Sequence, residues 1–254
     1  MEMRRMQVRR GALLEPTARA RQLAPQLADA LGRMRQLLRP ARFDPGAEQR
    51  VFRLAMSDYG AAVLLPALLP VLRAEAPQVD LVVSQASREA MTAQVQDGEI
   101  DLAFGVFPQL PAALVAQRLF AEEFVCVADR ASLGGGAALG LAAWLARPHV
   151  LLSLWADSGN EVDLALAQAG ARRRVCLTLP HWGVAPALVK GSDLVLTVAR
   201  RMVPAGAVDQ ALAVFAPPFA IAPFAFCQLW HRRREDDMAH RWLRQRIAAL
   251  AGAQ

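Results

Sequence analysis

The hydrophobic pattern of this chain changes its period near residue 50. Before that point, apolar residues recur with alternating steps of four and three, the heptad spacing at which one helix packs against another. This apolar seam comprises Leu23, Leu27, Ala30, Met34 and Leu37. The pattern predicts a helix over residues 17–38, with Thr17 as its candidate N-cap. Pairing with a second copy is favoured over an intramolecular core stripe, because little sequence surrounds this helix for it to pack on.

After residue 50, short apolar runs alternate with longer segments of helical period. Strands are expected at 51–57, 79–83, 101–106, 124–128, 150–154, 175–179, 194–197 and 225–231. Helices are expected at 59–75, 88–96, 139–145, 161–169, 182–189 and 238–250. Strands and helices that alternate at these lengths indicate right-handed βαβ units and parallel sheets. The expected fold class is therefore α/β, built as two units, with the chain crossing between them near Glu123 and again near Gln228.

Charge and composition narrow the class of protein. The net charge is +6, and arginines are concentrated in the first forty residues, which suits a segment near phosphates or the solvated face of a helix. The basic N-terminus does not resemble a signal peptide, and no apolar stretch reaches the ~20 residues of a membrane helix, so a cytoplasmic protein is expected. The adjacent Glu122 and Glu123 bracket a predicted crossing, and solvation or helix-dipole complementation explains them better than acid–base catalysis.

Motifs for catalysis, cofactors and metals are missing from the sequence. The three cysteines are widely spaced inside apolar runs and are expected to be buried small hydrophobes: Cys126, Cys176 and Cys227. The histidines have no Asp, Glu or Cys companions at ligand spacing, so no metal site is expected. The run Gly134–Gly136 lacks the remaining residues of a phosphate-binding loop, and no nucleophile–base motif is found. An enzyme is therefore not expected, and no cofactor is implied.

Several motifs resemble the effector domain of LysR-type transcription regulators, in particular the branch related to nodulation regulators. The resemblance is carried, in order along the chain, by Phe52-Arg-Leu-Ala-Met-Ser-Asp-Tyr59, Leu64-Leu-Pro66, Leu72-Arg-Ala-Glu-Ala-Pro77, Gly98-Glu-Ile-Asp-Leu-Ala-Phe-Gly105, Arg118-Leu-Phe-Ala-Glu-Glu-Phe-Val-Cys-Val127, Pro148-His-Val-Leu-Leu-Ser153, Arg173-Arg-Val-Cys-Leu-Thr-Leu-Pro-His181, Gly191-Ser-Asp-Leu-Val-Leu-Thr197, Leu229-Trp-His-Arg-Arg-Arg234 and Ala239-His-Arg-Trp-Leu-Arg244. It covers residues from about 9 to 254.

The resemblance implies a two-lobed, type 2 periplasmic-binding-protein-like effector domain preceded by a long dimerising helix. The implied parts are a wing remnant at 1–14, a linker helix at 15–42, a first lobe at 51–123 plus 228–254, and a second lobe at 124–227. Most of the winged helix-turn-helix that such regulators carry is not expected in this chain, through fragmentation, a late start codon or natural truncation. DNA would then be reached only through a missing or partner-supplied head.

The candidate site follows from the rule that ligands of two-lobed α/β folds bind outside the carboxyl ends of the strands, between the lobes. With the resemblance, that rule selects as effector-binding residues Ser57, Tyr59, Gln85, Ser87, Phe104, Gly105, Ser153, Trp155, His181, Trp182 and Thr197. Ser57 and Ser153 also fit helix caps, Trp182 also fits ordinary core, and Asp58 fits a cap or surface residue better than a ligand contact.

Two hypotheses about function remain beside an unsupported enzyme. The first is a regulator that senses a small anionic or aromatic effector between its lobes and acts as a homodimer or homotetramer. The second is a two-lobed solute-binding protein without a DNA role, which shares the fold. The heptad helix and the basic N-terminus, which does not resemble a signal peptide, favour the regulator.

Overall fold

The computed structural model describes residues 7–10, 13–16, 22–24, 27, 43–153, 160–203 and 211–252. The chain divides into two compact units, Met1–Phe43 and Asp44–Gln254. In the first unit, β1 (Gln7–Arg10) pairs antiparallel with β2 (Leu13–Pro16). Because this pairing extends to the end of β2 at Pro16, the strand runs past the boundary at residue 14 that was predicted for the wing remnant.

Only part of the predicted heptad helix lies within the described residues. Leu23 and Leu27 are helical; Leu23 is half-buried and Leu27 is exposed. Ala30, Met34 and Leu37 lie outside the described residues. Pairing of two subunits through this seam therefore stays a prediction.

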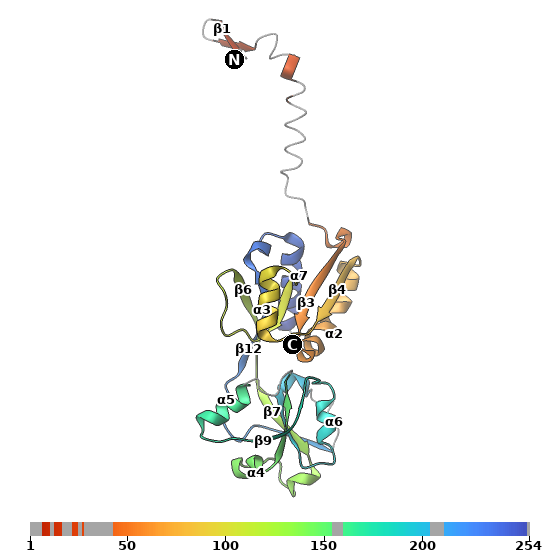
Figure 1. Cartoon of the computed structure of the whole chain (residues 1–254). Helices are drawn as coiled ribbons and strands as arrows, with labels where there is room; N and C mark the ends of the chain where they lie inside the picture. The colour runs from red at the N-terminus through yellow and green to blue at the C-terminus, as the bar shows by residue number, and fades with distance from the viewer. Residues whose placement is uncertain are drawn as a thin grey trace. The chain divides into compact units, whose positions relative to one another are not determined.

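The second unit contains two five-stranded sheets, each with its own helices (Figure 1). The first sheet has the order β4-β3-β5-β12-β6, from β3 (Arg50–Met56), β4 (Val79–Ser84), β5 (Leu102–Gly105), β6 (Leu114–Glu122) and β12 (Phe224–His231). Its helices are α2 (Asp58–Glu75), α3 (Arg88–Asp97) and α7 (Met238–Gly252). We call this assembly the first lobe. Helices α2 and α7 pack against each other, and α3 packs on β5 and β12.

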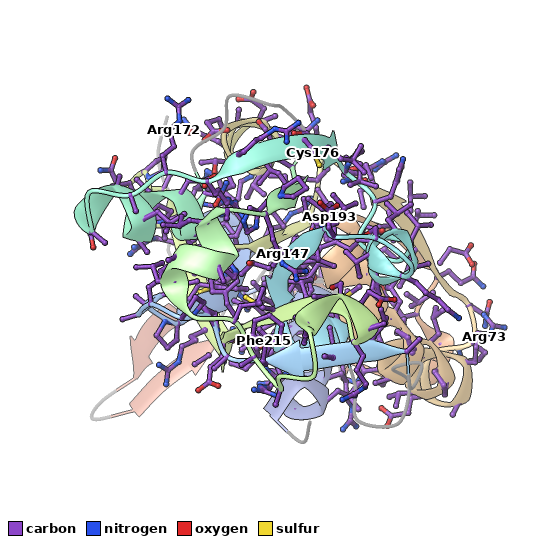
Figure 2. All side chains as sticks on the ribbon, turned by 90° about the horizontal axis from the view of Figure 1, so that it is seen from below. Arg73, Arg147, Arg172, Cys176, Asp193 and Phe215 are labelled. Atoms are coloured by element: carbon purple, nitrogen blue, oxygen red, sulfur yellow. The ribbon has the colours of Figure 1, made fainter. Side chains whose placement is uncertain are left out.

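The second sheet has the order β11-β7-β10-β8-β9 and forms the second lobe. Its strands are β7 (Phe124–Asp129), β8 (Pro148–Leu152), β9 (Arg174–Leu179), β10 (Val195–Ala199) and β11 (Leu212–Phe215). Its helices are α4 (Leu141–Leu145), α5 (Glu161–Gln168) and α6 (Ala185–Val189). Figure 2 views the molecule from the end of this lobe, where the guanidinium of Arg147 meets the carbonyl oxygen of Asp193 at 3.5 Å.

Each sheet is mixed rather than purely parallel, which corrects the prediction. In each lobe three strands form parallel pairs, and one strand runs against its neighbours: β12 in the first lobe and β7 in the second. Both are the first strand after a crossing between the lobes. Because the crossings leave from the carboxyl ends of β6 and β11, the next strand begins at that same edge and must run away from it.

The sequence pattern missed β6 and β11, and it placed the return crossing too late. Residues from Phe224 onward already pair with β6, with Phe224 opposite Glu122, whereas the prediction put the boundary at 228. Strand β6 alternates between buried and exposed residues only irregularly, so its period gives a weak signal. From residue 50 onward, the predicted helices and the other predicted strands agree with the structure to within a few residues at their ends.

The core of the second lobe is built around central strands that are buried on both faces. Val195, Leu196 and Val198 of β10 are all fully buried, as expected for a strand covered by helices on each side. Cys126 is buried, as predicted, and it also accepts a hydrogen bond from the Trp144 indole N–H at 3.3 Å. Cys176 is exposed and Cys227 only half-buried, so the prediction was wrong for both; Cys176 lies on β9, an edge strand.

His149 is a buried histidine in this core. Its Nε2–H donates to the Trp144 carbonyl oxygen at 2.9 Å, and within the described part of the chain its Nδ1 has no hydrogen-bond partner. Burial, more than any charge, lowers the pKa of His149 to about 4. The ordinary pKa of histidine is near 6.5. As the pH falls from about 6.5 to about 4, this side chain is therefore protonated in the unfolded chain but stays neutral in the folded chain, and the folded state is destabilised.

We therefore predict that wild-type protein loses thermal stability between about pH 7 and about pH 5, and that His149→Gln loses less. Glutamine can keep the donor to the carbonyl but does not titrate. The measurement is the unfolding midpoint against pH, with the exposed His181→Gln as the control that should follow the wild type. An identical fall in His149→Gln and wild type would contradict the prediction.

Candidate functional site

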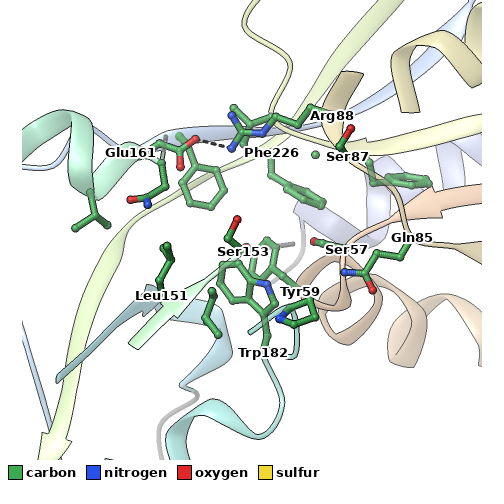
Figure 3. A pocket seen from close by; sticks show the side chains of 18 of the residues that line it. Ser57, Tyr59, Gln85, Ser87, Arg88, Leu151, Ser153, Glu161, Trp182 and Phe226 are labelled. Atoms are coloured by element: carbon green, nitrogen blue, oxygen red, sulfur yellow. Dashed lines mark hydrogen bonds and ion pairs between the residues drawn. The ribbon is translucent and has the colours of Figure 1, made fainter. Parts of the chain in front are cut away.

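A cavity of about 290 Å³ lies at the carboxyl ends of the strands and is lined by residues of both lobes (Figure 3). In the first lobe, the lining residues lie at or after the carboxyl ends of β3, β4 and β5. In the second lobe, they lie on or after β8, β9 and β10. Its volume is near the lower end of the range typical of ligand pockets. The site therefore suits a small molecule that contacts both lobes at once.

Nine of the eleven residues predicted from the sequence line this cavity: Ser57, Tyr59, Gln85, Ser87, Phe104, Gly105, Ser153, Trp182 and Thr197. Trp155 lies outside the described residues. His181 is exposed and does not line the cavity, so its prediction is corrected. It stands between Pro180 and Trp182, which both line the cavity, and neighbouring residues of non-helical backbone point to opposite sides. Effector binding by the nine residues remains a proposal.

Three helices begin at the cavity, each with its N-cap residue in the lining. Ser57 of α2 accepts from the Gly60 N–H at 3.4 Å, and Ser87 of α3 accepts from the Ala90 N–H at 3.2 Å. Asn160 of α5 accepts from the Asp163 N–H at 3.0 Å. Capping and cavity lining are thus compatible for Ser57, whereas α5 takes Asn160 rather than Ser153 as its cap. Helix N-termini carry partial positive charge, which favours acceptor groups in the cavity.

Aromatic rings form the apolar wall of the cavity. Tyr59 is buried, and its ring centroid lies 5.2 Å from that of Trp182 and 5.2 Å from that of Phe226, the latter edge-on. Phe124 and Phe224, whose ring centroids are 5.3 Å apart, come from the two crossings. Trp182 is half-buried, faces Tyr59 of the other lobe and also packs against the hydrophobic core of the second lobe.

Two polar contacts connect the lobes beside the cavity. The carboxylate of Asp58 accepts from the backbone N–H of Trp182 at 2.9 Å and of Gly183 at 3.3 Å. Asp58 therefore acts as a cap, as predicted, but for backbone of the opposite lobe. Arg88 and Glu161 form an ion pair of 2.7 Å from α3 to α5, drawn as the dashed line in Figure 3.

A buried carboxylate occupies the first crossing. Glu122 is 2 % exposed and accepts from the Tyr59 hydroxyl at 2.5 Å, from Arg201 at 3.2 Å and from the Glu123 N–H at 2.9 Å. The Arg201 guanidinium also lies 4.0 Å from the ring centroid of Phe120. The prediction of a solvated acidic pair was therefore wrong for Glu122. A carboxylate can be buried here because donors from both lobes replace its water.

Arg173 is a cavity residue that sequence reasoning missed. It immediately precedes β9, and its side chain is 2 % exposed. Its Nε donates to Asp163 at 2.7 Å, and its Nη2 to Asp163 at 3.1 Å and to Asn160 at 3.4 Å. The run Arg172–Arg174 gave no signal that its first and last members are exposed and its middle member buried.

Two groups stand out among the other lining residues that were missed. Asn160, Glu161 and Arg88 belong to helix starts, and Asn160 was recognisable as an N-cap before the predicted helix at 161–169. Phe224 and Phe226 were missed because the return strand was not expected to begin at the cavity.

Over the described residues, no group of three His, Cys, Asp or Glu is placed to hold a metal ion. Within those residues, too, none of the helices is both long and apolar enough to cross a bilayer.

Tyr59 offers a spectroscopic test of this arrangement because it is the only tyrosine of the chain. Burial first, and then the hydrogen bond to Glu122 and its charge, raise the pKa of Tyr59 well above its ordinary value; Arg201 opposes them. A raised pKa means that the protonated phenol stabilises the fold up to about pH 10, and that this contribution is lost above it.

We predict that the folded protein shows no tyrosinate absorbance at about pH 11, where an exposed tyrosine is mostly ionised. Glu122→Gln should lower the pKa of Tyr59, because it removes the negative charge beside the phenol. The measurement is an ultraviolet pH titration, with circular dichroism at each pH to confirm that the protein is folded. Tyrosinate that forms near pH 10 in the folded wild type would rule out the buried Tyr59–Glu122 contact.

Comparison with known proteins agrees with this geometry. The family model of the LysR substrate binding domain matches residues 45–252. The transcriptional regulator SyrM of Rhizobium meliloti is 32% identical over 245 residues, which cover 95% of this chain and 73% of SyrM. Nodulation protein D of Azorhizobium caulinodans is 25% identical over 241 residues, which cover 91% of this chain and 74% of that protein.

A solved structure shows the same likeness in three dimensions. The crystal structure of the probable transcriptional regulator PA0477 from Pseudomonas aeruginosa is 33% identical, with a TM-score of 0.74 over 95% of this chain and 82% of that chain. The resemblance to the nodulation-regulator branch and the two-lobed, type 2 periplasmic-binding-protein-like fold are thereby confirmed. The relatives are transcriptional regulators rather than solute-binding proteins. The chain belongs to the LysR family of transcriptional regulators, and residues 45–252 are its substrate-binding domain.

Proposed function

We propose that the cavity between the lobes binds a small-molecule effector whose occupancy controls how this regulator acts on transcription. The observation that carries the proposal is the shared lining: strand ends and helix N-caps of both lobes meet around one small space. A ligand in that space has a binding free energy that depends on the relative orientation of the lobes. It can therefore shift the population of lobe orientations, which a ligand held by one lobe alone cannot do.

The proposal assigns the nine lining residues predicted from the sequence to effector contact. Ser57, Ser153 and Thr197 supply hydroxyls from both lobes, while Phe104 and Trp182 supply apolar surface. We further propose that the heptad seam from Leu23 to Leu37 pairs two subunits, so that a lobe movement in one subunit changes the dimer or tetramer. DNA engagement is proposed on the likeness to transcriptional regulators of the helix-turn-helix type, and a cytoplasmic location is proposed with that role.

Ser153→Trp tests the effector site, because the indole fills the cavity from the middle of its lining. We expect the variant to fold with a midpoint of unfolding close to that of the wild type, since Ser153 is only half-buried. It should lose the thermal stabilisation that hits from a small-metabolite library give to the wild-type chain. Small-angle X-ray scattering of the protein with the same compounds should show a ligand-dependent change in the scattering profile of the wild type but not of the variant.

Ala167→Trp is the matched control, because it adds the same indole to an exposed position of α5 in the same lobe. It should keep every ligand response. If ligands stabilise Ser153→Trp as strongly as the wild type, they bind outside this cavity and the proposal is contradicted.

A further inference from the structure

Two ion pairs of the same kind lie next to each other at the first crossing between the lobes. Arg200 and Glu123 approach to 3.9 Å, and their side chains are 58 % and 69 % exposed. Arg201 and Glu122 approach to 3.2 Å, and their side chains are 27 % and 2 % exposed. Water screens the first pair, whereas the carboxylate of the second pair has lost its water and depends on protein donors. The two neighbouring arginines therefore have different roles.

Arg201 belongs to the second lobe. It lies in η3 (Arg200–Met202), the short 3₁₀ turn that directly follows β10. The backbone N–H of Arg200 donates to the Glu123 carbonyl oxygen at 2.9 Å, which holds this turn beside the crossing. The turn also contacts α2 of the first lobe. The backbone thus places the Arg201 side chain at the end of β6.

The Arg201 guanidinium contacts three consecutive residues of β6, which belong to the first lobe. Its Nη1 donates to the Ala121 carbonyl oxygen at 3.3 Å and to the Glu122 carboxylate at 3.2 Å. Its Cζ lies 4.0 Å from the centroid of the Phe120 ring. A planar guanidinium can donate hydrogen bonds from its edge while its face lies on a ring, so these contacts fix both its position and its orientation.

The residues that Arg201 contacts lead on to the cavity. The Phe120 ring stacks on Phe226 with 5.2 Å between centroids, and Phe226 meets Tyr59 edge-on (Figure 3). Tyr59 also donates to the Glu122 carboxylate, and both Tyr59 and Phe226 line the cavity. A rotation of the second lobe about the crossing would withdraw Arg201 and leave Glu122 buried without its charged partner. Such a rotation is unfavourable, because a buried carboxylate needs that partner.

We propose that Arg201 is the positioning residue that fixes the relative orientation of the two lobes when no effector is bound. It does so by clamping the end of β6 in the first lobe from a turn of the second lobe. The inference goes beyond the proposed function, because it concerns the protein without any ligand. It states which contact an effector must work against in order to change the population of lobe orientations.

Double electron–electron resonance on the full chain tests this proposal, because it measures the distance between a spin label on each lobe. One label is attached to the exposed Cys176 of β9, and the other to Gln96→Cys at an exposed position of α3. Cys227→Ser removes the half-buried thiol, and Cys126 is buried. The labelled chain is mixed with an excess of unlabelled chain, so that distances within one subunit dominate the signal.

We expect this labelled parent protein to give a single narrow distance distribution without any ligand. Arg201→Gln should lose it and give a broader distribution with a second maximum, because the second lobe then supplies no charged partner to Glu122. Arg200→Gln is the matched control, since it makes the same change of charge at the exposed neighbour. It should keep the parent distribution. Circular dichroism confirms that each variant is folded.

Arg201→Lys keeps the test decisive if Arg201→Gln does not fold. Lysine keeps a charge beside Glu122 but lacks the planar group that lies on Phe120, so its distribution should be broader than that of the parent. The proposal is overturned if the parent distribution is already broad, or if the folded Arg201 variant keeps the parent distribution. Equal broadening by Arg200→Gln would also overturn it. Because no effector is present, these results leave the proposed effector site standing.

Discussion

The two lobes depend on a buried carboxylate at the point where the chain first crosses between them. Glu122 ends β6, and its oxygens are shared by the Tyr59 hydroxyl of the first lobe and the Arg201 guanidinium of the second. A carboxylate removed from water is stable only while such partners stay in place, and loss of one partner of a buried pair costs about 3–5 kcal/mol. Because Tyr59 also lines the cavity, Glu122, which occupies the crossing, is one contact away from the cavity.

The crossings also explain why the cavity exists where it does. A chain that leaves one sheet at its carboxyl edge enters the other sheet at the corresponding edge, and the first strand after each crossing runs antiparallel to its neighbours. Both sheets therefore turn their carboxyl ends toward the same space. The loops that follow those ends also begin α2, α3 and α5, so three helix N-termini come to the cavity as a consequence of the topology.

How much of this was predictable depended on whether a feature has a local signal. Ser57, Gln85, Phe104, Ser153 and Thr197 follow apolar runs, and the rule on strand ends placed them in the cavity without any knowledge of packing. Arg173 and Phe226 had no comparable signal, because the burial of one arginine in a run of three and the start of the return strand are set by contacts distant in sequence. His181 failed for the opposite reason: it follows a strand end, but it is exposed and does not line the cavity.

The contacts across the cavity set what the proposed effector would have to change in order to move the lobes. The Arg88–Glu161 pair is partly exposed, and such pairs contribute about 0–1 kcal/mol. The backbone donors that Asp58 accepts add a comparable amount, since a typical hydrogen bond contributes about 0.5–1.5 kcal/mol net. These two contacts therefore stabilise the relative orientation of the lobes less than the buried Glu122 contacts at the first crossing do. A ligand needs about 5.5 kcal/mol of differential binding to move a two-state population from 1:99 to 99:1. Only a ligand that contacts both lobes, for example Tyr59 of the first and Trp182 of the second, can have such a difference in affinity between orientations, because those two rings belong to different lobes.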